Sequence, residues 1–337
     1  MRSSVSAFVG ILLVLPVFVQ CKTAPTGEGS ASTSSATTSS ASATAPALPP
    51  FVPPTAVPVA VPEQVKLLSN GEMPRRELRY KYKGAKESDM VMELGMTVQM
   101  GMGSASPGNP IVLPTTRITI HMIPKAVSDA GELTYDFEIK GIEVAGDSKA
   151  APPVIAAMKT AMEKIQGTRG SGVVTSTGES KSVSVNLAPD GAPQVRELME
   201  RMKQQLGEVA VRLPVDAVGK GAQWERTSGF IANGLMVEQI AKYTLVSLDG
   251  DAMKLSIAIT QKAQQQEIKA SGLPKGAKVY LETFQATGEG EATRDLTKLV
   301  GKSTSHVSSK ANSRVSQGGK DGPMTMNVEM STTTSPK

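Results

Sequence analysis

The 337-residue chain has little of several residue types on which folding and catalysis often depend. Its one cysteine, Cys21, excludes an intramolecular disulfide and any zinc site built from several cysteines. Its two histidines, His121 and His306, have no spacing that suggests a shared metal ion. Aromatic residues make up 4% of the sequence, so the core must be packed mainly from aliphatic side chains and methionine.

Long hydrophobic runs are also scarce, and the one that is present lies at the N-terminus. Arg2 precedes an apolar run from Val5 to Val19. A run of about 15 residues is shorter than the roughly 20 that a membrane-spanning helix needs. We therefore interpret residues 1–20 as a signal peptide, which predicts an exported protein.

The end of this run carries a short motif. The residues Phe18-Val19-Gln20-Cys21 resemble a lipobox, the site at which bacterial lipoproteins are acylated, with Gln20 where the motif usually has a small residue. The resemblance implies a lipid such as palmitate on Cys21, and a protein held to the cell envelope at the outer membrane or the periplasmic face. The alternative is an ordinary secretory signal with an incidental cysteine.

The next segment, residues 21–62, is rich in Ser, Thr, Ala and Pro and has few charges or large apolar groups. Such a composition cannot bury enough surface to fold, so we expect a disordered tether between the membrane and the rest of the chain. The formal net charge of +5 comes from 36 Lys and Arg against 31 Asp and Glu, mixed along the chain. Without a basic block, nucleic-acid binding is not expected.

The remainder reads mainly as β-strands that alternate apolar and polar residues, which predicts sheets with one buried face. We divide it into residues 63–210 and residues 211–330, which could also form one domain. The last residues, 331–337, are polar and are expected to fray. The alternating segments are Met90–Met102, Ile118–Met122, Leu133–Ile139, Val183–Leu187, Met253–Ile259 and Met324–Met330.

Two segments have helical spacing instead. One apolar stripe covers residues 154–165, between Pro152-Pro153 and Gly167, and another covers residues 195–206 before Gly207. An apolar stripe must be buried against something, and a sheet with one apolar face offers a partner. The sequence therefore predicts an α+β fold, mainly antiparallel β, with a curved sheet or half-barrels and two amphipathic helices packed on it.

A search for chemistry gives no catalytic residue, metal site or cofactor. His121 lies on the strand face opposite Ile120 and Met122, so we expect it to face solvent. The text Gly301-Lys302-Ser303 lacks the glycine five residues earlier that a phosphate-binding loop needs. We expect a protein that is not an enzyme, with a hydrolase assembled from dispersed residues as a minor alternative.

Methionine is unusually frequent, with 17 residues in the chain. Met92, Met96 and Met100 share one face of a predicted strand. Three interpretations are open: ordinary core packing, an adaptable cavity for a lipid or another apolar ligand, and a thioether site for Cu(I). We predict that these three residues form a candidate apolar ligand face and that no metal is bound.

The combination of a tether, long antiparallel strands and two helices resembles, in outline, the curved-sheet lipoprotein carriers and lipid-binding lipoproteins of bacterial envelopes. The text Leu213-Pro214-Val215, followed by Gly219 and Trp224, is similar to uncharacterised bacterial lipoprotein families. These resemblances imply a non-catalytic envelope lipoprotein that binds a lipid or another apolar ligand. The alternative is a structural or interaction lipoprotein without a ligand pocket. Protein partners are unknown.

Overall fold

A computed structural model describes residues 61–103, 108–145, 150–186, 203, 206–207, 209–232, 234–269, 273, 276–318 and 320–337. The predicted signal peptide, Cys21 and the tether up to residue 60 lie outside the described residues.

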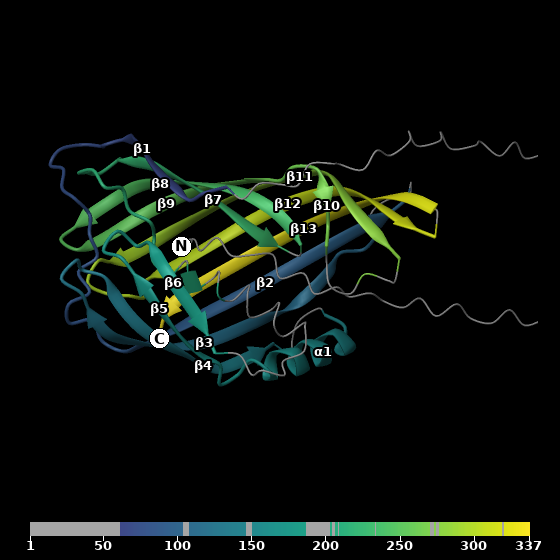
Figure 1. The fold of residues 1–337 in the computed structure, drawn as a ribbon, viewed down its shortest axis with the longest axis horizontal. Coiled ribbons are helices and arrows are strands. Elements are labelled where there is room, and N and C mark those ends of the chain that lie inside the picture. Colours follow the sequence, from purple (N-terminus) through teal and green to yellow (C-terminus); the bar gives the residue numbers. More distant parts are fainter. Residues whose placement is uncertain are drawn as a thin grey trace, which may run out of the picture.

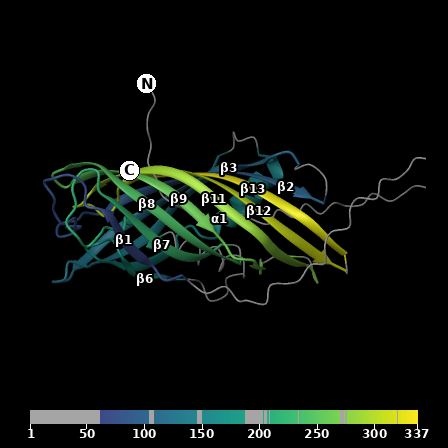
Figure 2. The ribbon, with the colours of Figure 1, turned by 90° about the horizontal axis from the view of Figure 1, so that it is seen from above.

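The described elements form a 13-stranded sheet in which neighbouring strands are antiparallel (Figures 1 and 2). The first elements are β1 (Gln64–Ser69), β2 (Ser88–Met102), β3 (Ile111–Val127), β4 (Leu133–Val144), α1 (Pro152–Glu163), β5 (Arg169–Val174) and β6 (Ser180–Val185). They are followed by β7 (Gln223–Ala232), β8 (Leu235–Asp249), β9 (Ala252–Lys262), β10 (Gln266–Glu267), β11 (Lys278–Asp295), β12 (Lys302–Gln317) and β13 (Lys320–Pro336).

The strand order is β1-β7-β8-β9-β11-β12-β13-β2-β3-β4-β5-β6, and β10 pairs with β11. Strands from residues 63–210 and from residues 211–330 therefore lie in one sheet, joined where β13 pairs with β2. The prediction that residues 331–337 fray is wrong, because Ser331–Pro336 pair with β2 and the N–H of Lys337 donates to the carbonyl of Asp89 at 2.9 Å.

The alternating pattern predicts the strands correctly because each long strand buries one face. In β2 the side chains of Met90, Met92 and Met96 are buried while Val91 and Glu93 between them are half-exposed. A tight turn joins β8, which ends at Asp249, to β9, which begins at Ala252, with Gly250 at a φ of 51°. Glycine adopts this left-handed conformation without a steric penalty.

The predicted α+β fold with two helices packed on the sheet is wrong, because the described residues form a nearly all-antiparallel β fold. Helix α1 is where the sequence predicts it and buries Met158 and Met162, and its main strand contacts are with β3 and β4 (Figure 1). Most of the second predicted helix, residues 195–206, lies outside the described residues; Lys203 and Leu206 are helical. Connecting segments, rather than two helices, cover part of the apolar face.

Two connecting segments cross one end of the sheet, namely residues 70–87 and residues 209–222. Their backbones pair with each other where the N–H of Arg76 donates to the carbonyl of Val218 at 3.0 Å. They also pair with the turns of the sheet, as Leu213 does when its N–H donates to the carbonyl of Thr177 at 2.9 Å. These bonds bring the two edges of the sheet together at this end.

We call this the tyrosine end, because Tyr80 and Tyr82 of the crossing segment are buried there. It is the end at which β2 begins and β13 finishes. The opposite end, where β2 finishes at Met102 and β13 begins, is the methionine end. The same long strands therefore connect two ends of different composition.

Candidate functional site

The face of the sheet that carries the buried side chains, called the inner face below, contains the predicted ligand residues. Met92, Met96 and Met100 share this face. Met92 and Met96 are 7% and 6% exposed, while Met100 is 38% exposed. Met92 and Met96 of the predicted ligand face are therefore packed in the core, and only Met100, nearest the methionine end, is exposed.

One row of the inner face leads from these methionines toward α1. In the paired register, Met92 lies opposite Ile118, and Ile118 lies opposite Ile142. Directly opposed residues on one sheet face are in side-chain contact range, so the row is a continuous apolar strip. Its far end reaches a pocket.

The pocket lies between α1 and the end of β4 and has a volume of about 290 Å³. Its apolar lining comes from Ile142 and Val144 of the inner face and from Met162 of the helix. This volume is at the lower end of the range for small-molecule sites, which are usually apolar with a few polar groups. The polar lining residues are Glu143, Lys159, Glu163 and Gln166.

The tyrosine end is filled by aromatic rings. Tyr80 and Tyr82 stack with their ring centroids 5.3 Å apart, and Trp224 stacks on Tyr243 at 5.5 Å. Trp224 is 0% exposed, and its indole N–H donates to the carbonyl of Arg212 at 2.9 Å. Large buried aromatics contribute strongly to packing, so this end is a firm core.

A buried cationic side chain lies in the same region. Arg294 of β11 is 3% exposed and lies beside Tyr80, Tyr82 and Tyr243. Burial lowers the pKa of its guanidinium and raises the pKa values of the Tyr80 and Tyr82 hydroxyls, which therefore stay neutral. A Cβ at Gly301 would collide with this guanidinium, so glycine is required for the close approach.

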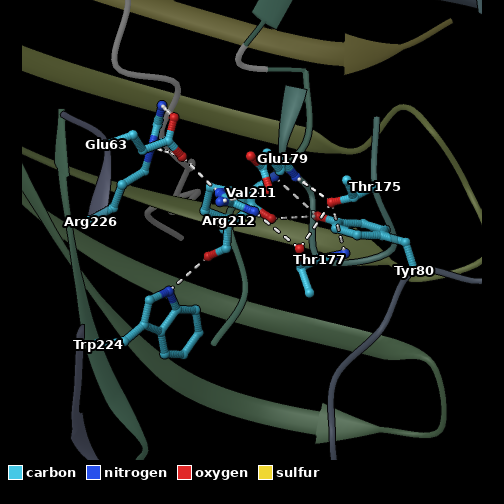
Figure 3. A network of polar contacts seen from close by, with 9 residues as sticks. All are labelled: Glu63, Tyr80, Thr175, Thr177, Glu179, Val211, Arg212, Trp224 and Arg226. Atoms are coloured by element: carbon cyan, nitrogen blue, oxygen red, sulfur yellow. Dashed lines mark hydrogen bonds and ion pairs between the residues drawn. The ribbon is translucent and has the colours of Figure 1, made fainter. Parts of the chain in front are cut away.

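An ionic cluster, called the arginine latch below, ties the two sheet edges together (Figure 3). The guanidinium of Arg212 is 2.7 Å from Glu63, which precedes β1, and 3.2 Å from Glu179, which lies in the turn between β5 and β6. Arg212 also donates to the hydroxyl of Thr177 at 3.0 Å, and Arg226 of β7 lies 3.2 Å from Glu63. The latch therefore spans from one edge of the sheet to the other.

The arginines of the latch keep the Glu63 carboxylate ionised. Partial burial alone would raise the pKa of Glu63, but attraction and hydrogen bonds from Arg226 and Arg212 outweigh it and hold that pKa below its ordinary value. Glu63 is thus ionised at neutral pH and is held by two arginines. This arrangement is structural, because both arginines are occupied by protein groups.

The histidines do not form a catalytic arrangement. His121 lies on the outer face as expected, but it is 19% exposed rather than solvent-facing, because its Nδ1 is 2.7 Å from Asp89. At His306, the carboxylate of Glu329 stands between the imidazole, at 2.9 Å, and the hydroxyl of Ser308, at 2.7 Å. A serine triad requires histidine in the middle position, so this order cannot activate the serine.

Within the described residues, no three His, Cys, Asp or Glu side chains come together as a metal site. Cys21, the predicted lipidation site, lies outside those residues. The sequence did not point to the pocket beside α1, and it did not show that methionines of β13 face those of β2. A signal for the second feature was present in the two spaced pairs Met100-Gly101-Met102 and Met324-Thr325-Met326.

Comparison with known proteins adds little to this description. No protein family and no curated protein matches the sequence. A solved structure that is similar is a loop-deletion mutant of OmpT, an outer membrane protein of Vibrio cholerae. It has 5% sequence identity and a TM-score of 0.20, over 73% of this chain and 99% of that chain.

A TM-score of 0.20 does not establish a shared fold, so this likeness assigns neither a family nor a function. The likeness also does not test the resemblance to lipoprotein carriers, which stays a prediction. Among the described residues, no helix combines the length and apolar character needed to span a bilayer.

Proposed function

We propose that the protein is a non-catalytic lipoprotein of the bacterial cell envelope that binds a lipid or another apolar ligand in the pocket between α1 and β4. The observation that carries the proposal is the continuity of the apolar strip from Met92 through Ile118 to Ile142 with that pocket. An acyl chain can enter the pocket against Ile142, Val144 and Met162, while Lys159 at the pocket supplies a cation for an acidic head group.

The pocket is tested by native mass spectrometry of residues 61–337, which contain every strand, after incubation with palmitate. We expect one bound palmitate, and we expect Val144→Trp to abolish binding because the indole fills the pocket. Ile231→Trp is the matched control, because Ile231 is 51% exposed and does not line the pocket. Absence of palmitate, or equal uptake by both variants, contradicts the pocket and favours the structural lipoprotein.

The anchor is tested separately. Cells that are fed a clickable palmitate analogue should label the wild-type protein and not Cys21→Ser. Equal labelling of both would show that Cys21 is not the acylated residue. Because this readout does not depend on the pocket, either half of the proposal can fail alone.

A further inference from the structure

The methionine end carries two spaced methionine pairs that face each other across β13 and β2. In the strand register, Met324 lies opposite Met102, and Met326 lies opposite Met100. The first and third residues of each motif point to the same side of a strand, so all four side chains lie on the inner face. The fold thus brings together four thioethers from two pairs that lie more than 200 residues apart in the chain. Local sequence patterns do not reveal that two such distant strands pair.

The dimensions of this cluster suit a single ion. Directly opposed residues of an antiparallel pair have Cβ atoms about 4.5–5.5 Å apart, and alternate residues of one strand are about 7 Å apart. Methionine has three rotatable side-chain bonds, which allow the four sulfur atoms to converge from these positions. The residues opposite Met324 and Met326 on the other side of β13 are Ser313 and Ala311, whose side chains are small.

The exposure of these methionines differs from that of core residues. Met102 is 57% exposed and Met100 is 38% exposed, and Met324 and Met326 are half-buried. Farther along the same two strands, the opposed Met96 and Met330 are 6% and 2% exposed. Met96 and Met330 fill the core, whereas Met100 and Met102 are accessible to a solute. Met324 and Met326 are partly accessible, and Met326 also packs against the margin of the core.

The chemistry of the donor set selects the kind of ion. Thioether sulfur is soft and uncharged, and it favours Cu(I) over the hard cations Mg²⁺ and Ca²⁺, which prefer oxygen ligands. Thioethers need no deprotonation to act as ligands, and they cannot be lost to disulfide formation as thiols can. We propose that Met100, Met102, Met324 and Met326 bind one Cu(I) ion at the methionine end. This site is separate from the proposed ligand pocket.

The test is an anaerobic titration of the full chain with Cu(I) against the colorimetric chelator bicinchoninate. It is carried out in a Cys21→Ser background, so that a free thiol cannot take the metal. We expect one Cu(I) per chain, and we expect the fourfold variant Met100→Leu, Met102→Leu, Met324→Leu, Met326→Leu to lose it. Leucine is close to methionine in volume, so the fold should be retained, and an unchanged thermal transition checks this.

The matched control is Met96→Leu with Met330→Leu, an opposed pair on the same strands that is buried. This control should keep the Cu(I) uptake. X-ray absorption of the copper-loaded protein should show sulfur neighbours without nitrogen or oxygen. Failure of the wild type to compete with bicinchoninate, undiminished uptake by the fourfold variant, or nitrogen and oxygen ligands would each overturn the proposal. Palmitate binding is read from the Val144→Trp variant, so the two sites succeed or fail independently.

Discussion

The two ends of the sheet are built by the same strands but differ in how far the inner face is covered. At the tyrosine end, Trp224 is buried, and one of the two crossing segments contributes the stacked and buried Tyr80 and Tyr82. At the methionine end, the face finishes in Met100 and Met102, which are accessible. Rigid aromatic rings pack one end firmly, whereas the flexible thioethers at the other end are those of the proposed Cu(I) site.

The difference arises from the connections. Both crossing segments pass over the tyrosine end, and their backbone groups are paired with strand ends and turns, as in the 2.6 Å bond from the N–H of Lys81 to the carbonyl of Leu296. Residues paired in this way carry side chains that seal the inner face. A comparison of equivalent mutations at the two ends therefore tests whether stability and binding are divided between them.

The largest effect is expected from Trp224→Ala. The indole is fully buried, stacks on Tyr243 and donates to the carbonyl of Arg212, so its loss should lower the free energy of unfolding by roughly 3–5 kcal/mol. The corresponding change at the other end, Met102→Ala, should cost under about 0.5 kcal/mol because that side chain is mostly exposed. Urea unfolding followed by circular dichroism measures both, and similar losses would show that the two ends do not differ.

The fold could be predicted where a local pattern dictates it. The alternation of Met90–Met102 predicts β2, and Pro152-Pro153 with Gly167 brackets α1. The last strand was predicted only in part, over Met324–Met330; its end was missed because residues 331–335 are Ser and Thr, which suggest a polar tail. Their pairing with β2, at the other end of the chain, depends on long-range register that no local pattern contains, although threonine itself favours strands.

The expectation of two helices on a sheet failed for a related reason. The apolar face of the sheet needed a cover, and helical stripes were the visible candidates in the sequence. The structure buries Leu78, Tyr80 and Tyr82 from a connecting segment. These residues alternate with Arg79 and Lys81, but this strand-like pattern does not show that the segment crosses the end of the sheet. Of the candidate site, the sequence predicted that Met92, Met96 and Met100 share a face, but not the methionines opposite them.

A smaller effect is expected from Arg212→Ala, which removes the centre of the arginine latch. Glu179 would lose this ion pair and Glu63 would keep Arg226 alone of its two arginines, so the free energy of unfolding should fall by about 1–3 kcal/mol. The matched control is Arg117→Ala, because Arg117 also joins two carboxylates but lies in solvent on the outer face, where ion pairs contribute little. Equal losses in the two variants would mean that the latch does not hold the sheet edges together.

The smallest effect concerns pH, and it again separates the two ends. Because the folded-state pKa of Glu63 is held below its ordinary value of 4.5, its contribution to stability is present above that pH and is lost as the pH falls through the lower, folded-state value. The stability difference between the wild type and Glu63→Gln should therefore be largest near neutral pH and should shrink on acidification. Hydrogen exchange should show the loss in β1, β7 and residues 209–213, which the latch joins, while β2 and β13 at the methionine end keep their protection because thioethers do not titrate. A difference that grows in acid, or an equal loss of protection in β2 and β13, would contradict the assignment of this pH dependence to the latch.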